Sequence, residues 1–352
     1  TNNPICKSFF NFNKNLYEFP ISELDYMPNK NTNRQIKNKN TSLNGGICAI
    51  SMFKNEAKHL RKMLDSISPY IDYWVLQDNG STDGSRDIVN QWHEETKIPG
   101  LLYTLQEGWV GFGWNRDHVL KTAREQNHNC GWIMKMDCDE YLQVDDNFEW
   151  NILNIDETSP ESFDICASAP GCIYFRTWLW RADLPWRINH DPAHETVYLE
   201  NYSEGYEFSR KQMPISFKMI AGESQGESYS NPTKYVSDAL KLEEKLIREG
   251  SMLKNNYHFW YIGKSYEDGY ACNQLPLKET HKREFARRCI FYFEEVLSHT
   301  HPGYRETKNA NRIDEMSYYA VNVIVMYRFL ETLYCIDIIK GQNSLVHLKT
   351  II

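Results

Sequence analysis

Residues 132–140 read Trp132-Ile133-Met134-Lys135-Met136-Asp137-Cys138-Asp139-Glu140, a short apolar run that ends in an acidic cluster. A run of this length predicts a buried strand over residues 132–136. Two carboxylates separated by one residue at a strand end can both approach one hard divalent cation, such as Mg²⁺ or Mn²⁺, which takes oxygen ligands. The stretch therefore predicts a buried strand with a candidate metal site, Asp137 and Asp139, at its carboxyl end.

Strands and helices alternate on the N-terminal side of this strand. The pattern predicts strands at 47–52, 73–76 and 101–105, and helices at 56–68, 85–94 and 112–126. We expect Asn55 to cap the first of these helices. The alternation is typical of an α/β domain with a mostly parallel sheet and helices on both faces.

The C-terminal half has a different pattern. Residues 150–225 are more strand-like and aromatic, and helices are predicted at 234–249, 257–267, 278–298 and 312–339. We interpret these helices as an array of helical hairpins. The expected organisation is a polar arm at 1–45, an α/β domain at 46–225 and a helical domain at 226–352.

The composition fits a globular protein with about two domains at roughly 150 residues each. The chain has 352 residues, of which 41% are hydrophobic, and its net charge is −8. The acidic balance argues against a nucleic-acid partner. The sequence shows no signal peptide and no apolar stretch long enough to span a membrane. Together with nine scattered cysteines, an odd number without C-x-x-C pairs, this favours a cytoplasmic location.

Polar clusters at 53–56, 78–83 and 137–140 follow three of the predicted strands. In sheets of this type, ligands bind beyond the carboxyl ends of the strands. The carboxylate of Asp78 can accept hydrogen bonds from a base or a ribose, and the helix start that follows favours a phosphate. The same cluster also reads as a turn and a helix cap supplied by Ser81 or Asp83.

Four motifs in order resemble those of family 2 glycosyltransferases of the GT-A fold. They are Ser51-Met52-Phe53-Lys54-Asn55-Glu56, Asp78-Asn79-Gly80-Ser81-Thr82-Asp83, Asn115-Arg116-Asp117 and Asp137-Cys138-Asp139. The resemblance implies that the nucleotide of a sugar donor is held by the segment that includes Phe53, Asn55 and Glu56, and by Asp78. It implies that Asn115 and Arg116 support the donor site, and that Asp137 and Asp139 place Mn²⁺ or Mg²⁺ on the donor diphosphate.

A narrower resemblance extends toward the C-terminus. Phe175-Arg176, Trp186-Arg187 and His194-Glu195 are similar to a branch of the family with an aromatic and arginine-rich stretch and a His-Glu pair. That branch continues into tetratricopeptide-like helices, and 234–249 is similar to the first of them. Arg176, Arg181 and Arg187 can clamp a phosphate or form structural ion pairs, and Arg187 joins the donor-binding candidates. Trp178, Trp180 and Trp186 suit either an acceptor platform or the core.

Inverting transfer requires a base for the acceptor hydroxyl and a metal for the departing diphosphate. Glu195 is the first candidate for the base, and Asp191 is the second. His194 can complete the metal shell, since neutral imidazole is a common ligand. The branch often carries a His on a late strand, but residues 217–224 contain none here. The third ligand is therefore His194, Glu223 or water.

The leading hypothesis is a metal-dependent, inverting glycosyltransferase. It would move a sugar from a nucleotide-sugar, UDP-linked, to a hydroxyl of a glycan or polypeptide acceptor. The alternative is a GT-A-like scaffold without activity, whose helical tail binds a protein partner; the tail can also mediate homo-oligomers. A nucleotidyltransferase would usually begin with a glycine-rich phosphate loop, and residues 51–56 contain no glycine. A few hydroxyl contacts decide which sugar is transferred, and the sequence does not identify them.

Overall fold

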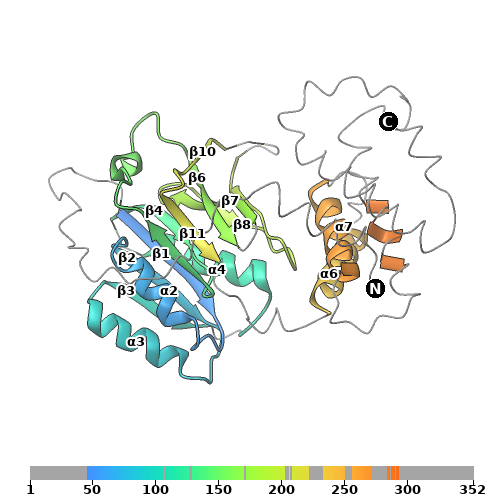
Figure 1. Ribbon diagram of the computed structural model, residues 1–352, viewed down its shortest axis with the longest axis horizontal. Coiled ribbons are helices and arrows are strands. Elements are labelled where there is room, and N and C mark those ends of the chain that lie inside the picture. The colour runs from blue at the N-terminus through green and yellow to red at the C-terminus, as the bar shows by residue number, and fades with distance from the viewer. Residues whose placement is uncertain are drawn as a thin grey trace, which may run out of the picture. The chain divides into compact units, whose positions relative to one another are not determined.

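The computed structural model describes most of the region between residues 46 and 271, and part of a helix beyond it (Figure 1). The described residues are 46–105, 108–126, 129–169, 172–202, 206, 208–221, 233–249, 256–271, 284, 285, 287–289, 291 and 292. The polar arm expected at 1–45 and the helix expected at 312–339 lie outside them. The chain divides into two compact units, 1–190 with 195–226, and 191–194 with 227–352. The domain ranges expected from the sequence stay predictions.

Four parallel strands form one half of the sheet of the first unit, in the spatial order β3-β2-β1-β4. They are β1 (Gly46–Phe53), β2 (Tyr73–Asp78), β3 (Gly100–Thr104) and β4 (Cys130–Lys135). The four strands predicted from the apolar runs are thereby confirmed. Phe53 pairs with Asp78, and Ile50 pairs with Lys135, so the residues that follow β1, β2 and β4 reach the same edge of the sheet.

The other half of the sheet is mixed. β7 (Cys172–Arg181) runs antiparallel to both β4 and β6 (Ser162–Ala169). β11 (Phe217–Ala221) is parallel to β6 and antiparallel to β5 (Glu140–Val144), and β10 (Arg210–Gln212) pairs with β6. β8 (Trp186–Ile188) and β9 (Val197–Leu199) form a separate antiparallel pair, and η2 (Trp150–Leu153) is a short 3-10 helix. The prediction of a mostly parallel sheet therefore holds for β1 to β4, and antiparallel pairs extend it.

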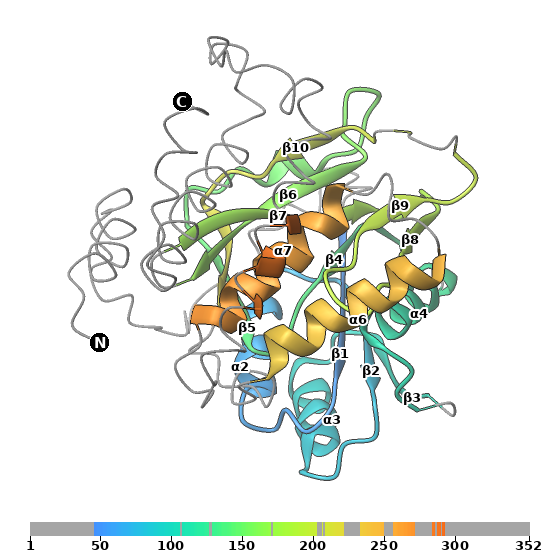
Figure 2. The same ribbon diagram turned by 90° about the vertical axis from the view of Figure 1, so that its right-hand side faces the viewer.

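Helices cover both faces of the sheet, as predicted. α2 (Leu60–Ile67) and α3 (Ser85–Thr96) share a core with Ala49 of β1, whereas α4 (Phe112–Glu125) shares a core with Cys48. Figure 2 shows α2 and α4 on opposite sides of β1. Neighbouring residues of a strand point to opposite faces, so β1 is buried on both sides, which explains why it is apolar apart from Ser51.

The prediction that Asn55 caps a helix over 56–68 is wrong. α2 begins at Leu60, and its N-cap His59 makes no capping bond through its side chain. Asn55 has a φ of 56°, and its Oδ1 accepts a hydrogen bond from Thr82 N at 2.8 Å. Asn55 therefore joins the loops after β1 and β2, an interaction between distant residues that outweighs its local capping preference.

The second unit contains α6 (Lys234–Glu249) and α7 (Asn256–Ala271), which confirm the helices predicted at 234–249 and 257–267. Their shared core includes Leu242, Leu246, Phe259 and Ile262. A Cβ added to Gly269 would lie 2.8 Å from Cγ2 of Val236, so a glycine permits the close packing of the two helices. Residues 284, 285, 287–289, 291 and 292 are helical, within the helix predicted at 278–298. These elements do not test the tetratricopeptide-like interpretation.

Among the helices in the described part of the chain, none has the length and apolar character needed to cross a membrane. Cys48, Cys130, Cys138, Cys166 and Cys289 are buried free thiols.

Candidate active site

The loops after β1 and β2 are joined to each other at the carboxyl edge of the sheet. Asn55 N donates to Ser81 Oγ and Ala57 N donates to Asp83 Oδ2, both at 2.9 Å. The N-cap of α3 is Gly84, whereas Ser81 and Asp83 are the predicted caps; Asp83 precedes the N-cap and accepts a hydrogen bond from Ser85 N at 3.1 Å. The clusters 53–56 and 78–83 therefore form one surface.

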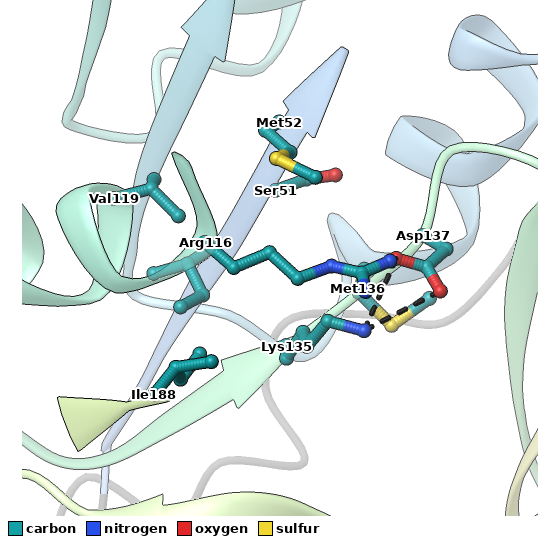
Figure 3. A pocket seen from close by; sticks show the side chains of 9 residues that line it. Ser51, Met52, Arg116, Val119, Lys135, Met136, Asp137 and Ile188 are labelled. Atoms are coloured by element: carbon teal, nitrogen blue, oxygen red, sulfur yellow. Dashed lines mark hydrogen bonds and ion pairs between the residues drawn. The ribbon is translucent and has the colours of Figure 1, made fainter. Parts of the chain in front are cut away.

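The centre of the site is a carboxylate held by two cations. Arg116 of α4 donates through Nη2 to Asp137 Oδ1 at 3.2 Å, and Lys135 Nζ lies 3.1 Å from the same oxygen. Figure 3 shows both side chains extending toward Asp137 beside a pocket. Arg116 also donates through Nη1 to Glu195 Oε2. The structure thus brings the predicted base, Glu195, and the first candidate metal ligand, Asp137, onto one guanidinium.

The two carboxylates of the acidic motif lie in different electrostatic surroundings. Burial raises the pKa of Asp137, but Lys135 and Arg116 outweigh burial and hold it well below its usual value. Burial and the negative charge of Asp137 raise the pKa of Asp139. The site therefore disfavours a second negative charge beside Asp137 unless a further cation is present.

Trp178 of β7 lies against two positively charged side chains. Lys135 Nζ and the guanidinium carbon of Arg176 each lie 3.5 Å from the centre of its ring. Arg176 donates through Nη2 to Glu140 Oε1 at 2.5 Å. Burial and Asp137 raise the pKa of Glu140 to about 7, and burial and Arg116 lower that of Lys135 to about 8. Charged groups of both signs are therefore crowded around Asp137 with little access to water.

The sequence motifs do not identify Lys135 or Glu140 as site residues. One signal was available for Lys135, because it is the single charge within the apolar run 132–136. A charged residue in the middle of a buried strand requires a partner, and that partner is Asp137.

Several donor-binding candidates are buried and bonded within the protein. Phe53 is 2% exposed and packs in the core, so only its backbone is available to a ligand. Asp78, also 2% exposed, accepts a hydrogen bond from Ser81 N and pairs with Arg86 at 3.3 Å. Glu56 N donates to Ser85 Oγ at 2.9 Å. These contacts shape the loops, and the proposed contacts with a donor stay predictions.

Asn115 is fully buried at the start of α4. Its Oδ1 accepts hydrogen bonds from Val110 N and Gly111 N at 3.1 and 3.0 Å, and its Nδ2 donates to Asn79 Oδ1 at 3.0 Å. Asn115 therefore fixes the chain before α4 to the loop after β2, which supports the site without exposing the side chain.

Arg187 is engaged in a structural ion pair. Its Nε and Nη2 donate to Asp117 at 3.0 and 2.6 Å, and its Nη1 donates to Glu200 at 2.7 Å. Arg181 pairs with Asp183, so all three candidate phosphate clamps have carboxylate partners. The contacts of Arg187 and Arg181 favour structural ion pairs over phosphate binding. The positive charge of Arg176, in contrast, helps to lower the pKa of Asp137.

The remaining tryptophans of this region are in the core. Trp180 and Trp186 are both 0% exposed, so the core interpretation is confirmed for these two. The middle residue of the acidic motif, Cys138, is also buried, and its Sγ lies 3.4 Å from Ser51 Oγ. Its side chain therefore points into the protein, as a residue between two metal ligands is expected to do.

Asp191 and His194 belong to the second unit. Asp191 is 1% exposed, and its carboxylate contacts Lys245 and, at 2.9 Å, His258 Nε2. The ring of His194 stacks on Tyr261 with centroids 3.9 Å apart. These partners favour a structural role for Asp191, and the base and metal roles of the two residues stay predictions.

The described residues contain no group of three or more His, Cys, Asp or Glu side chains placed to hold a metal ion. Asp137 and Asp139 nevertheless fit a divalent cation, because the pKa of Asp139 is raised partly by the neighbouring negative charge. Two hard oxygen ligands suit Mg²⁺ or Mn²⁺, which commonly take their other ligands from substrate phosphates and water.

A comparison with protein families matches residues 48–162, about a third of the chain, to the family described as "Glycosyl transferase family 2". The matched segment contains most of β1, all of β2 to β5 and the acidic motif, so the cluster at the carboxyl edge of the sheet lies within the glycosyltransferase-like part of the chain. Residues 48–162 are therefore similar to family 2 glycosyltransferases, and the predicted enzyme class, glycosyltransferase, is confirmed.

Solved structures give more distant likenesses. One is the mannosyltransferase PcManGT from Pyrobaculum calidifontis in complex with GDP-Man and Mn²⁺, with 14% identity, a TM-score of 0.38, and coverage of 72% of this chain and 86% of that chain. Glucosyl-3-phosphoglycerate synthase from Mycobacterium tuberculosis has 16% identity and a TM-score of 0.25, covering 36% and 44%. GalNAc-T7 with UDP, GalNAc and Mn²⁺ has 10% identity and a TM-score of 0.35, covering 73% and 57%. These likenesses are too distant to transfer a substrate. No curated protein matches the chain.

Proposed function

We propose that this enzyme is a metal-dependent glycosyltransferase that moves a sugar from a UDP-linked donor to a hydroxyl of a glycan or polypeptide. The observation that carries the proposal is the bridge from Arg116 to both Asp137 and Glu195. It joins a carboxylate suited to a divalent cation with a carboxylate suited to proton transfer. We further propose inversion at the anomeric carbon, as in the branch of family 2 with a His-Glu pair and a helical tail.

The chain supplies the groups that the reaction needs. Asp137 and Asp139 would hold Mn²⁺ or Mg²⁺, which supplies stabilisation of the negative charge on the departing diphosphate. Glu195 takes the proton of the acceptor hydroxyl as that oxygen bonds to the anomeric carbon and the bond from this carbon to the diphosphate oxygen breaks. Because Arg116 occupies one oxygen of Glu195, it orients the carboxylate and leaves the other oxygen to face an acceptor.

The test is release of nucleoside diphosphate from a panel of UDP- and GDP-sugars, with Mn²⁺, with Mg²⁺ and with a chelator. We expect turnover with at least one UDP-sugar and none with the chelator. Glu195→Gln should lower the rate about 100-fold or more, which is typical for loss of a general base. Glu200→Gln, which removes a half-exposed carboxylate paired with Arg187, is the matched control and should retain most of the rate.

Two results would overturn the proposal. Equal rates for Glu195→Gln and Glu200→Gln would exclude Glu195 as the base. Absence of turnover, together with UDP binding that does not depend on Mn²⁺, would favour the alternative of a scaffold without activity.

A further inference from the structure

Lys135 is a lysine within a buried strand, 8% exposed. Its ammonium lies 3.1 Å from Asp137 Oδ1 and 3.5 Å from the centre of the Trp178 ring. Removing an ammonium from water is costly unless a partner compensates it. Asp137 supplies the ion pair that the structure shows for this lysine. Each of the two charges therefore compensates the other.

The oxygen that Lys135 contacts is already shared. Asp137 Oδ1 also accepts the hydrogen bond from Arg116 Nη2 at 3.2 Å. A divalent cation bound by this carboxylate would sit about 2.0–2.2 Å from an oxygen, close to both positive groups. Like charges at such short range repel strongly in a site with little water. A metal and the two cations therefore compete for Asp137.

Arg116 and Lys135 differ in what holds them in place. Arg116 has a second anchor in Glu195 through its other nitrogen. Lys135 faces the positive charges of Arg116 and Arg176, and both of them oppose its own charge. Lys135 also lines the small pocket beside Asp137 (Figure 3). Of the two cations, Lys135 is the one free to exchange partners.

We propose that Lys135 is an internal counter-cation that competes with the divalent metal for Asp137 and moves to the donor diphosphate when metal and donor bind together. The inference rests on the proposed function. It makes Lys135 a positioning residue for donor loading. A metal alone binds weakly because it must displace the Lys135 ammonium from Asp137. Metal and nucleotide bind synergistically because the phosphates of the nucleotide then pair with the displaced ammonium.

The test compares Lys135→Met with Lys121→Met in the chain of residues 1–352. Methionine keeps most of the lysine stem against Trp178 and removes the charge. Lys121 is an exposed lysine on α4 that pairs with Glu125, so its variant controls for net charge. Binding of Mn²⁺ alone, of UDP alone and of UDP with Mn²⁺ is measured by calorimetry, and thermal melting checks the fold.

For Lys135→Met we expect Mn²⁺ alone to bind at least about tenfold more tightly than to wild type, the effect typical of one nearby charge. The increase in UDP affinity caused by Mn²⁺ should fall by a similar factor. Lys121→Met and Lys135→Arg, which retains a cation beside Asp137, should both behave as wild type. This pattern reports on loading and not on turnover.

Each remaining outcome is decisive. If the wild type binds UDP with Mn²⁺ but Lys135→Met binds Mn²⁺ no more tightly than the wild type does, the proposed exchange is overturned and the proposed function stands. Wild type that shows no binding of Mn²⁺ with UDP overturns both. If Lys135→Met does not fold, a crystal structure of the wild type with Mn²⁺ and UDP decides, because an ammonium still bonded to Asp137 would overturn the exchange.

Discussion

Replacing Arg116 by lysine tests whether its guanidinium holds the site together. The guanidinium spans Asp137 and Glu195, whose side chains are 30% and 8% exposed. An ammonium can satisfy one of them and leaves the other without its charged partner. A charge-assisted hydrogen bond contributes about 1.5–3 kcal/mol, and a buried charge left unpaired costs about 3–5 kcal/mol. Since Lys135 still contacts Asp137, we expect the free energy of unfolding to fall by about 2–4 kcal/mol.

Urea unfolding followed by tryptophan fluorescence measures this loss. Nine of the ten tryptophans precede residue 190, so the signal reports mainly on the first unit. Arg61→Lys is the matched control, because Arg61 also bridges two carboxylates, Asp65 and Glu95, but on the surface. Exposed pairs contribute about 0–1 kcal/mol. Equal small losses in the two variants would refute the view that the buried bridge organises the site.

Two further predictions concern the residues around this bridge. Asp117→Asn should lower the free energy of unfolding by about 2 kcal/mol at pH 7, because Asp117 accepts charged hydrogen bonds from Arg187. Burial raises the pKa of Asp117, but hydrogen bonds from Arg187 and Ile188 lower it below its usual 3.8. The stabilisation is therefore complete above that value and is lost as the pH falls through the folded pKa; melting curves of variant and wild type that stay equally far apart in acid would contradict this. Cys138→Ala should leave Mn²⁺ affinity within about twofold and cost about 1 kcal/mol of stability, so a large loss of affinity in calorimetry would show that Cys138 faces the ion.

The parts of the fold that depend on local pattern could be predicted from the sequence. β1, β2 and β4 are apolar runs because both faces of the sheet are covered there, and these runs are visible in the residues themselves. α6 begins and ends at the predicted residues for a similar reason, since its apolar face repeats with the helical period.

Interactions between distant residues account for what the sequence did not reveal. The sequence predicts that Asn55 caps a helix, but its side chain instead accepts a hydrogen bond from Thr82, 27 residues away. The sequence predicts that Arg187 binds a phosphate, but in the structure its guanidinium pairs with Asp117, 70 residues away. The opposite case is Glu195, for which the sequence suggested a role and the fold supplied the partner, Arg116. The local sequence shows which side chains are available, whereas the fold determines which charged groups they contact.

We propose that Asp137 and Asp139 load the donor through a divalent cation, and Asp139→Asn tests this role most directly. Burial and Asp137 raise the pKa of Asp139, so removing its charge should leave the melting temperature of the metal-free protein unchanged or higher. Calorimetry should show UDP binding that depends on Mn²⁺ in the wild type and is weaker by about tenfold or more in the variant. Equal Mn²⁺-dependent UDP affinity in the two proteins would contradict the claim.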